Sequence, residues 1–343
     1  MSSIMTNASA LTALQSLNAT NKNLETTQSR ISTGYRVNDA SDNAAYWSIA
    51  TTMRSDNQAL SSVQDALGLG ASKVDTAYTG MNKAVDTINQ IKTKLVSAYG
   101  ATDADKAKIQ TEIASLQAQM KSYADGATFS GTNMLSVDTT TGTAAAGTAD
   151  KVKIVSAFNR SSAGAASIST IDIDVNSIKL YDAYGADKST GVPDSTNFAK
   201  AGILDGARTN DGARATALGT AVVLGDAAAT GDTYNVASMA LVAGGKTASD
   251  SQISDMIGVV EGALKDMTTA ATTLGANKSR IDLQKTFTQS LMDSIDRGVG
   301  QLVDADMNKE STRLQALQVQ QQLGIQALSI ANGSSQSILS LFR

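Results

Sequence analysis

Two pairs of carboxylates are the residues of this chain whose type and spacing could do chemistry. Asp172 and Asp174 alternate in TIDIDV at 170–175, and Asp304 and Asp306 alternate in VDADMNKE. Paired carboxylates can hold a hard cation or serve as the two catalytic groups of a glycosidase. Alternating polar residues more often face water, and we prefer that explanation for both pairs. A glycosidase built from carboxylates alone stays an open alternative.

The composition removes most other chemistry. The 343 residues include no histidine and no cysteine. The commonest general base and metal ligand is therefore missing, as are disulfides and thiolate metal sites. A metallopeptidase with a His-Glu-x-x-His motif is excluded for the same reason. We expect no enzyme, no cofactor and no bound metal.

Charge and hydropathy limit the partners. The formal net charge is −4, with Lys and Arg spread along the chain, which argues against nucleic acid or an anionic membrane. The start, MSSIMTNASALTALQSL, lacks the positive segment and apolar core of a cleaved signal peptide. No apolar run approaches the roughly 20 residues that span a bilayer.

The elements that would position any site fall into three zones. Pro193 is the only proline, and 13 of the 27 glycines lie between Ser136 and Lys246. Because both ends are almost free of helix breakers, they favour long helices. The middle contains VKI at 152–154 and TIDIDV at 170–175, whose alternation indicates strands with one wet face.

Both ends carry apolar residues at alternating steps of three and four, which places them on one face of a helix. These segments are 14–31, 60–95, 109–123, 253–274 and 287–302, and the last segment, 302–341, carries a wider pattern of two apolar stripes. The last would be about 60 Å long as one helix, at roughly 1.5 Å per residue. The sequence therefore predicts a mainly α fold. Long paired N- and C-terminal helices would form a coiled-coil or helical-bundle stem, with a small β-containing insert domain.

Helix ends are marked by turn and cap residues. Gly34, with Arg30 in the last turn, predicts the end of the first helix. The other predicted caps are Asn38, Asp39 and Ser41 before the second helix and two capping boxes, Thr102 with Asp105 and Thr247 with Asp250.

The helical ends cannot fold alone. Burying the five apolar residues of 11–31 would stabilise the first end by on the order of 1.5–3 kcal/mol each. Ordering about thirty residues costs roughly 1–2 kcal/mol apiece, and hydrogen bonds recover only part of that. The additional apolar contact that would balance this cost must come from the other end of the same chain, as a simple coiled coil, or from neighbouring subunits in a stacked assembly. The apolar pattern alone favours the coiled coil.

The motifs resemble those of bacterial flagellins. SRISTGYRVNDASDNAAYWSIATTMRSD at 29–56 is similar to the amino-terminal signature of that family. KIQTEIASLQAQMKSYADGATFSGTNML at 108–135 is similar to its second core helix with a Thr-Phe-x-Gly hairpin. LGANKSRID at 274–282 and VDADMNKESTRLQALQVQQQLGIQALSIANGSSQSILSLF at 303–342 resemble its carboxy-terminal signature.

The resemblance implies a structural subunit that polymerises into the helical flagellar filament used for swimming motility. Residues 1–42 and 303–343 would be inner-tube helices, 43–140 and 247–302 the outer-tube core, and 141–246 a variable surface insert. The family is exported unfolded by the flagellar type III system and folds on assembly outside the cell. The implied partners are further copies, alone or mixed with related flagellins, an export chaperone, the filament cap and the hook-associated junction proteins.

The resemblance also implies that the sites are subunit contacts. The inner-tube contacts would be Leu14, Leu17, Leu24, Ile31, Leu314, Leu317, Leu328 and Ile338. The outer-tube contacts would be Val74, Met81, Ile88, Ile113, Leu116, Ile257, Val260 and Leu264. Tyr46 and Trp47 would insert between subunits where the chain passes from one tube to the other.

Two segments depart from the commoner family pattern. Asn43, Tyr46 and Trp47 lie in the stretch that plant flagellin receptors recognise in other members. Residues 92–94 read Lys-Thr-Lys where many flagellins detected by the animal Toll-like receptor have Arg-Glu-Leu. We predict weak recognition by both receptors.

Two other functions fit parts of the sequence. A hook-filament junction protein would share the terminal helices, although the carboxy-terminal motif favours the main subunit. A helical adhesin or secreted coiled-coil effector would also tolerate the absence of Cys and His. Polymerisation on added seeds would distinguish the main subunit from the adhesin or effector.

Overall fold

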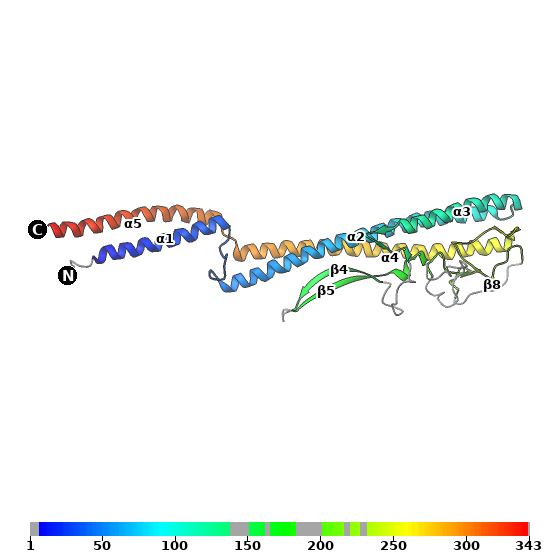
Figure 1. Cartoon of the computed structure of the whole chain (residues 1–343), viewed down its shortest axis with the longest axis horizontal. Helices are drawn as coiled ribbons and strands as arrows, with labels where there is room; N and C mark the ends of the chain where they lie inside the picture. The colour runs from blue at the N-terminus through cyan, green and yellow to red at the C-terminus, as the bar shows by residue number, and fades with distance from the viewer. Residues whose placement is uncertain are drawn as a thin grey trace. The chain divides into compact units, whose positions relative to one another are not determined.

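The computed structural model describes residues 7–137, 151–161, 165–182, 201–215, 220–226 and 232–341, without the side chains of 220–221 and 334–341. The helices are α1 (Ala8–Thr33), α2 (Ala44–Ala98), α3 (Asp103–Gly126), α4 (Asp250–Val303) and α5 (Met307–Leu341) (Figure 1). The strands are β1 (Thr128–Phe129), β2 (Thr132–Asn133), β3 (Ser136–Val137), β4 (Lys151–Arg160), β5 (Ala166–Asp174), β6 (Tyr181–Asp182), β7 (Arg208–Thr209), β8 (Thr220–Ala221), β9 (Asp232–Tyr234), β10 (Val242–Ala243) and β11 (Lys246–Thr247). The predicted mainly α class with a small strand-containing middle region is confirmed.

The chain forms two compact units. The first comprises Met1–Ala59 and Ser290–Arg343, and the second comprises Leu60–Gln289. Helices α2 and α4 each contribute to both. The strands all belong to the second unit, so the middle of the chain shares a unit with the helices on which it packs.

The first unit has a small apolar core where α2 and α4 meet the segment that follows α1. Val37, Ala50, Val299 and Val303 are buried there. Met53, Ile295 and Leu302 pack against them, partly buried.

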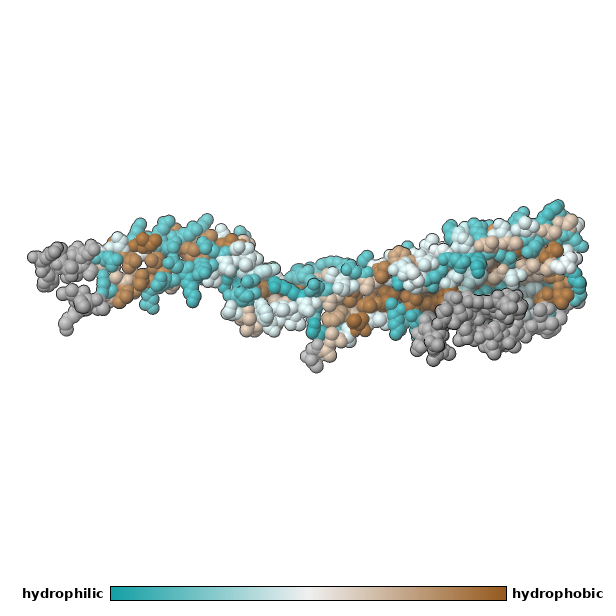
Figure 2. All heavy atoms as spheres, in the orientation of Figure 1, coloured by the Kyte–Doolittle hydropathy of each residue, from teal (hydrophilic) through white to brown (hydrophobic). Residues whose placement is uncertain are grey.

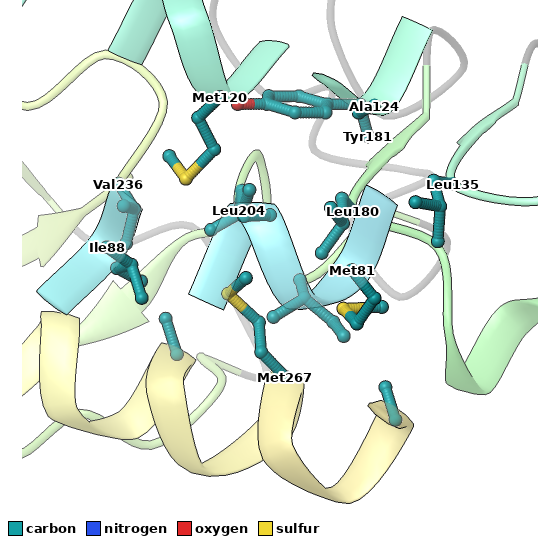
Figure 3. Close-up of a cluster of buried hydrophobic side chains, with 14 of the residues drawn as sticks. Met81, Ile88, Met120, Ala124, Leu135, Leu180, Tyr181, Leu204, Val236 and Met267 are labelled. Atoms are coloured by element: carbon teal, nitrogen blue, oxygen red, sulfur yellow. The ribbon is translucent and has the colours of Figure 1, made fainter. Parts of the chain in front are cut away.

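The core of the second unit lies between α2, α3 and α4. Met81 of α2, Met120 of α3 and Met267 of α4 are fully buried and surround a common interior (Figure 3). Residues from the segments between α3 and α4 complete this cluster: Leu135, Leu180, Tyr181, Leu204 and Val236. Flexible methionines fill the space that few aromatic residues are available to fill.

Two of the predicted helix ends are confirmed. Gly34 ends α1 in the left-handed conformation, with φ 75°, and its N–H donates to the Arg30 carbonyl at 2.9 Å. Thr102 caps α3: its hydroxyl accepts from the Asp105 N–H at 3.4 Å and donates to the Asp105 carboxylate at 2.9 Å.

Two other predicted caps are wrong. Helix α2 is capped by Asn43, not by Asn38, Asp39 or Ser41, because the Asn43 Oδ1 accepts from the N–H groups of Ala45 and Tyr46, both at 3.1 Å. The capping box of α4 joins Ser249 and Gln252, not Thr247 and Asp250. The Ser249 N–H donates to the Gln252 Oε1 at 3.1 Å, and the Gln252 N–H donates to the Ser249 Oγ at 3.4 Å.

The segment 302–341 is not one helix. Helix α4 ends at Val303 and α5 begins at Met307. Asp306 starts α5, because its Oδ1 accepts from the N–H groups of Asn308 at 3.1 Å and Lys309 at 3.2 Å. This role in capping accounts for Asp306 without a metal.

Strands β4 and β5 form an antiparallel ribbon that confirms the alternation of TIDIDV. Ile171 and Ile173 are buried at 1% exposure each, while Asp172 and Asp174 face water. Asp172 lies opposite Lys153 and Asp174 opposite Lys151, so cross-strand charge complementarity accounts for both carboxylates. The Thr-Phe-x-Gly hairpin also forms, as β1–β2, with φ 49° at Ser130 and 74° at Gly131.

The extended segment before α4 is held against α3 by two glutamines. The Gln117 Nε2 donates to the carbonyls of Val236 at 2.8 Å and Met239 at 3.0 Å. The Gln110 Oε1 accepts from the Leu241 N–H at 2.5 Å. These bonds satisfy buried backbone groups that have no strand partner.

Asp205 is a largely buried carboxyl group in the same unit. Its Oδ2 accepts from the Asp182 N–H at 2.7 Å, and its Oδ1 has no hydrogen-bond partner. Burial, with a smaller contribution from the nearby Asp182 carboxylate, raises the pKa of Asp205 to about 6, although the hydrogen bond from the Asp182 N–H opposes the rise. The folded chain therefore binds a proton between about pH 4 and pH 6 that the unfolded chain has released, so this group stabilises the fold less as the pH rises through that range.

We expect Asp205→Asn to raise the free energy of unfolding by on the order of 2–3 kcal/mol at about pH 7.5 and to change it little at about pH 4. The substitution removes a carboxylate that must ionise in a buried place. Urea titrations of both proteins at the two pH values measure the difference. A difference that is the same at both pH values would contradict the prediction.

Candidate subunit interface

Helices α1 and α5 lie side by side and run in opposite directions (Figure 1). The Arg30 Nη1 approaches the Glu310 Oε1 at 3.4 Å. The Gln321 Nε2 donates to the Asn21 Oδ1 at 2.8 Å, and the Asn7 Nδ2 donates to the Ala331 carbonyl at 2.9 Å. Residue numbers fall along α1 as they rise along α5, so the two ends of one chain form an antiparallel pair.

The contact between α1 and α5 is made mostly by small and polar residues. Thr20 and Thr27 are buried, and the Thr20 hydroxyl donates back to the Ser16 carbonyl at 2.9 Å. Leu317, at 7% exposure, is a buried leucine of α5. The predicted contacts Leu17, Leu24, Ile31, Leu314 and Leu328 are only half-buried, and the side chain of Ile338 lies outside the described residues. The pair therefore buries little apolar surface for its length.

Large apolar side chains instead face outward from this pair. Ile330 is 73% exposed and Leu323 is 59% exposed on α5, and Leu11 is 58% exposed on α1. Leu14, Val319 and Ile325 are also exposed. Figure 2 shows apolar atoms gathered on the surface of the helices at this end of the chain. Val319, Leu323 and Ile330 share one face of α5, whereas Ile325 is about 200° around the helix from Leu323. We call Leu11, Leu14, Val319, Leu323 and Ile330 the outward stripe. Two isolated helices with such a surface are marginal in water.

A groove runs beside the outward stripe between the two helices. Its volume is about 510 Å³. It is lined by the small residues Ser9, Thr12, Ala13, Ser16, Gly324, Ala327 and Ala331. Small side chains let another helix approach closely.

The segment between α1 and α2 pairs with the segment between α4 and α5. The Arg36 N–H donates to the Val303 carbonyl at 2.6 Å, and the Ala305 N–H donates to the Gly34 carbonyl at 2.8 Å. Next to them, the N–H groups of Asn38 and Asp39 donate to the Asp42 carboxylate and hold its pKa below the usual value. Both helix connections are thus fixed by backbone hydrogen bonds.

Tyr46 and Trp47 lie on the surface of the first turn of α2. They are 41% and 39% exposed, and Ile49 beside them is 49% exposed. The Arg36 guanidinium lies over the Tyr46 ring, 5.9 Å from its centroid, within the range of a cation–π contact. The aromatic surface is available to a second chain, as the interface prediction requires; the contact itself stays a prediction.

The predicted outer-tube contacts are mostly core residues of one chain. Val74, Met81, Ile88, Ile113 and Val260 have no exposed surface. A side chain that is fully buried in its own chain cannot touch a neighbour, so the structure corrects this part of the predicted interface. Leu116, Ile257 and Leu264 are half-buried at the edge of the same core and stay candidates.

Sequence reasoning missed an exposed apolar pair on α4. Leu283 is 70% exposed and Phe287 is 60% exposed. Their spacing of four places them on one helix face. The apolar periodicity of 287–302 predicts that Phe287 is buried, but its neighbour Thr288 is the buried residue, at 1% exposure.

The segment that departs from the family at 92–94 is tied to neighbouring helices. The Lys92 Nζ lies 2.7 Å from the Glu261 carboxylate of α4, and the Lys94 Nζ lies 2.5 Å from the Glu112 carboxylate of α3. The predicted weak receptor recognition stays a prediction.

Two other site classes find no support in the part of the chain that the structure describes. None of its helices is long and apolar enough to cross a membrane. Nor do three or more Asp or Glu residues come together there in a way that could hold a metal ion.

Two family models match the chain. The bacterial flagellin N-terminal helical region matches residues 4–140, and the bacterial flagellin C-terminal helical region matches residues 257–342. Together they cover more than half of the sequence. The chain belongs to the bacterial flagellin family. The unmatched residues between the two regions include most of the strands of the second unit.

Full-length relatives agree with this flagellin assignment. Flagellin C of Rhizobium meliloti (strain 1021) is 50% identical over 349 residues. Flagellin of Brucella melitensis biotype 1 is 48% identical over 343 residues, and Flagellin A of Rhizobium meliloti (strain 1021) is 46% identical over 404 residues. Each alignment covers 100% of both chains. The protein is a structural subunit of the flagellar filament.

Proposed function

We propose that this flagellin polymerises mainly through the outward stripe of its α1–α5 pair. The observation that supports this is the exposure of large apolar side chains in a single chain: Leu11, Leu323 and Ile330 are all more than half exposed, and the contact within the chain leaves most of its leucines only half-buried. Burial of each such side chain by a neighbouring copy would stabilise the assembly by about 1.5–3 kcal/mol. Assembly then adds to the marginal stability that the pair has in a single chain.

The groove between α1 and α5 would receive apolar side chains of a neighbouring copy. Its walls are alanine, glycine, serine and threonine, so the approaching helix meets no bulky side chain. In this arrangement residues 1–42 and 303–343 form an inner tube, 43–140 and 247–302 an outer tube, and 141–246 the outer surface. Tyr46 and Trp47 would contact a neighbour between the two tubes.

Subunit contacts in the outer tube require apolar side chains that stay exposed in the folded single chain. Leu283 and Phe287 are the best candidates on α4, because both are more than half exposed. Leu116, Ile257 and Leu264 would contribute their exposed edges.

Export and the remaining partners follow from family membership. We propose secretion through the flagellar type III system, contact with an export chaperone, the filament cap and hook-associated junction proteins, and a role as a structural protein without enzymatic activity. Related flagellins could join the same filament.

Ile330→Asp tests the interface. Because Ile330 is exposed in a single chain, the monomer should keep its circular dichroism spectrum and urea midpoint. A charge in the buried interface should raise the concentration needed for seeded polymerisation by on the order of a hundredfold. Ile330→Leu, which keeps an apolar side chain, should polymerise normally. Normal seeded growth of Ile330→Asp filaments, seen by electron microscopy, would rule out this surface.

A further inference from the structure

A turn of the second unit touches the backbone of α4 directly. Gly258 and Gly262 stand one turn apart in GVVEG on α4, and the turn contributes Gly212, whose φ is 81°. A Cβ at Gly262 would overlap the Gly212 carbonyl oxygen, and a Cβ at Gly212 would overlap the Gly258 carbonyl oxygen. A Cβ at Gly258 would lie 2.9 Å from the Asn210 carbonyl oxygen. Only glycine permits this approach on either side.

Arg208 ties the same turn to α4 by charge. Its side chain is 2% exposed, and its Nη2 lies 2.6 Å from the Asp266 carboxylate, one turn beyond Gly262. Its Nη1 donates to the Gly212 carbonyl at 3.0 Å and its Nη2 to the Ile203 carbonyl at 3.3 Å. The Nε has no hydrogen-bond partner. The Asp266 side chain is 41% exposed, so water reaches one end of this ion pair.

The turn also has a local structure of its own. The Thr209 N–H donates to the Ala213 carbonyl at 2.9 Å, and the Gly212 N–H donates to the Thr209 carbonyl at 2.8 Å. Arg208 and Thr209, as β7, pair with Tyr234 and Thr233 of β9. The turn carries no large apolar side chain onto α4, in contrast to the α2–α3–α4 core, where such side chains are fully buried.

We propose that residues 208–214 form a clasp that opens as a local unit. The clasp packs on the α4 backbone at Gly258 and Gly262, which we call the glycine notch, and the Arg208–Asp266 ion pair holds it there. Opening releases β7 from α4 and loosens its pairing with β9, while the α2–α3–α4 core, which includes the buried Tyr234 of β9, stays folded. Backbone contacts and one partly hydrated ion pair hold the clasp, whereas buried apolar area holds the core, and the two therefore differ in local stability. The local stability of the clasp therefore determines how firmly β7 and the segments next to it are attached to α4.

Hydrogen–deuterium exchange of the full-length monomer tests the clasp with Gly262→Ala. The matched control is Gly275→Ala on the same helix, where a Cβ would meet only the Tyr78 ring at 3.7 Å. Both substitutions add the same methyl group and the same gain in helix propensity. We expect the amides of 207–215 and 232–234 to exchange on the order of tenfold faster in Gly262→Ala. Amides of α2 and α3 should be unchanged, and Gly275→Ala should match the original protein.

A second variant tests the ion pair separately from the close backbone contact at the glycines. Asp266→Asn leaves the notch intact and the buried Arg208 without its counter-ion, and it should speed exchange of the same amides. Unchanged exchange at 207–215 in both Gly262→Ala and Asp266→Asn would overturn the proposal. Equal loss of protection throughout α2, α3 and α4 in either variant would also overturn it, because the turn would then be part of the core.

Discussion

Leu317→Asp is expected to abolish filaments and to separate α1 from α5 in the monomer. Leu317 is buried at 7% exposure between the two helices. Glu310, also buried and two turns earlier on α5, already pairs with the Arg30 guanidinium, at 3.4 Å. Arg313, one turn earlier on α5, is exposed, so a carboxylate at position 317 would have to leave the helix contact to pair with it in water, and keeping the charge buried costs several kcal/mol. The helices should part so that the carboxylate can reach water.

Electron microscopy of secreted or seeded protein measures the loss of filaments, and helicity by circular dichroism reports the separation. Gln318→Asp adds the same charge at the next, exposed residue and should leave helicity unchanged. Leu317→Asp differs from Ile330→Asp in the monomer, since only Leu317 is buried within one chain. Full helicity in the Leu317→Asp monomer would contradict the antiparallel pair.

Lys179→Met is expected to lower the free energy of unfolding of the second unit by about 3–5 kcal/mol. The Lys179 Nζ lies 2.6 Å from the Asp182 Oδ2, and the two side chains are 2% and 0% exposed. Removing the ammonium group leaves a carboxylate in the interior without its cation. Urea unfolding monitored by tyrosine fluorescence measures the change.

Two control variants sharpen the Lys179 experiment. Lys83→Met removes a pair with Asp86 whose atoms are 3.9 Å apart and whose side chains are 60% and 67% exposed, and it should cost less than about 1 kcal/mol. Combining Lys179→Met with Asp182→Asn removes both charges and should recover part of the loss. Equal effects of Lys179→Met and Lys83→Met would show that the buried pair has no special weight.

The helices could be predicted from periodicity, but their partners could not. Val74 and Leu323 both belong to regular apolar patterns, yet Val74 is at 0% exposure in the core of one chain and Leu323 is 59% exposed. Periodicity identifies the face of a helix that is apolar and says nothing about which chain covers it. Five of the predicted outer contacts are therefore core residues of one chain, while the inner contacts stay predictions.

The caps show a second limit of the sequence. Thr247 and Asp250 have the spacing of a capping box, but Thr247 pairs with Val242 in β10–β11, so the box forms two residues later at Ser249 and Gln252. Competing local pairings decide such boundaries. The sequence pattern does not predict the hydrogen bonds of Gln110 and Gln117, because their partners are backbone groups more than a hundred residues away.

The antiparallel pair of α1 and α5 also governs when the chain can finish folding. Asn7 contacts Ala331 across a sequence separation of 324 residues. The end that is synthesised first must wait for nearly the whole chain to follow before its partner helix arrives, and pairing segments so far apart in the sequence is slow. The length of the chain thus acts as a delay, because the two adhesive ends cannot pair until nearly all of it has been released.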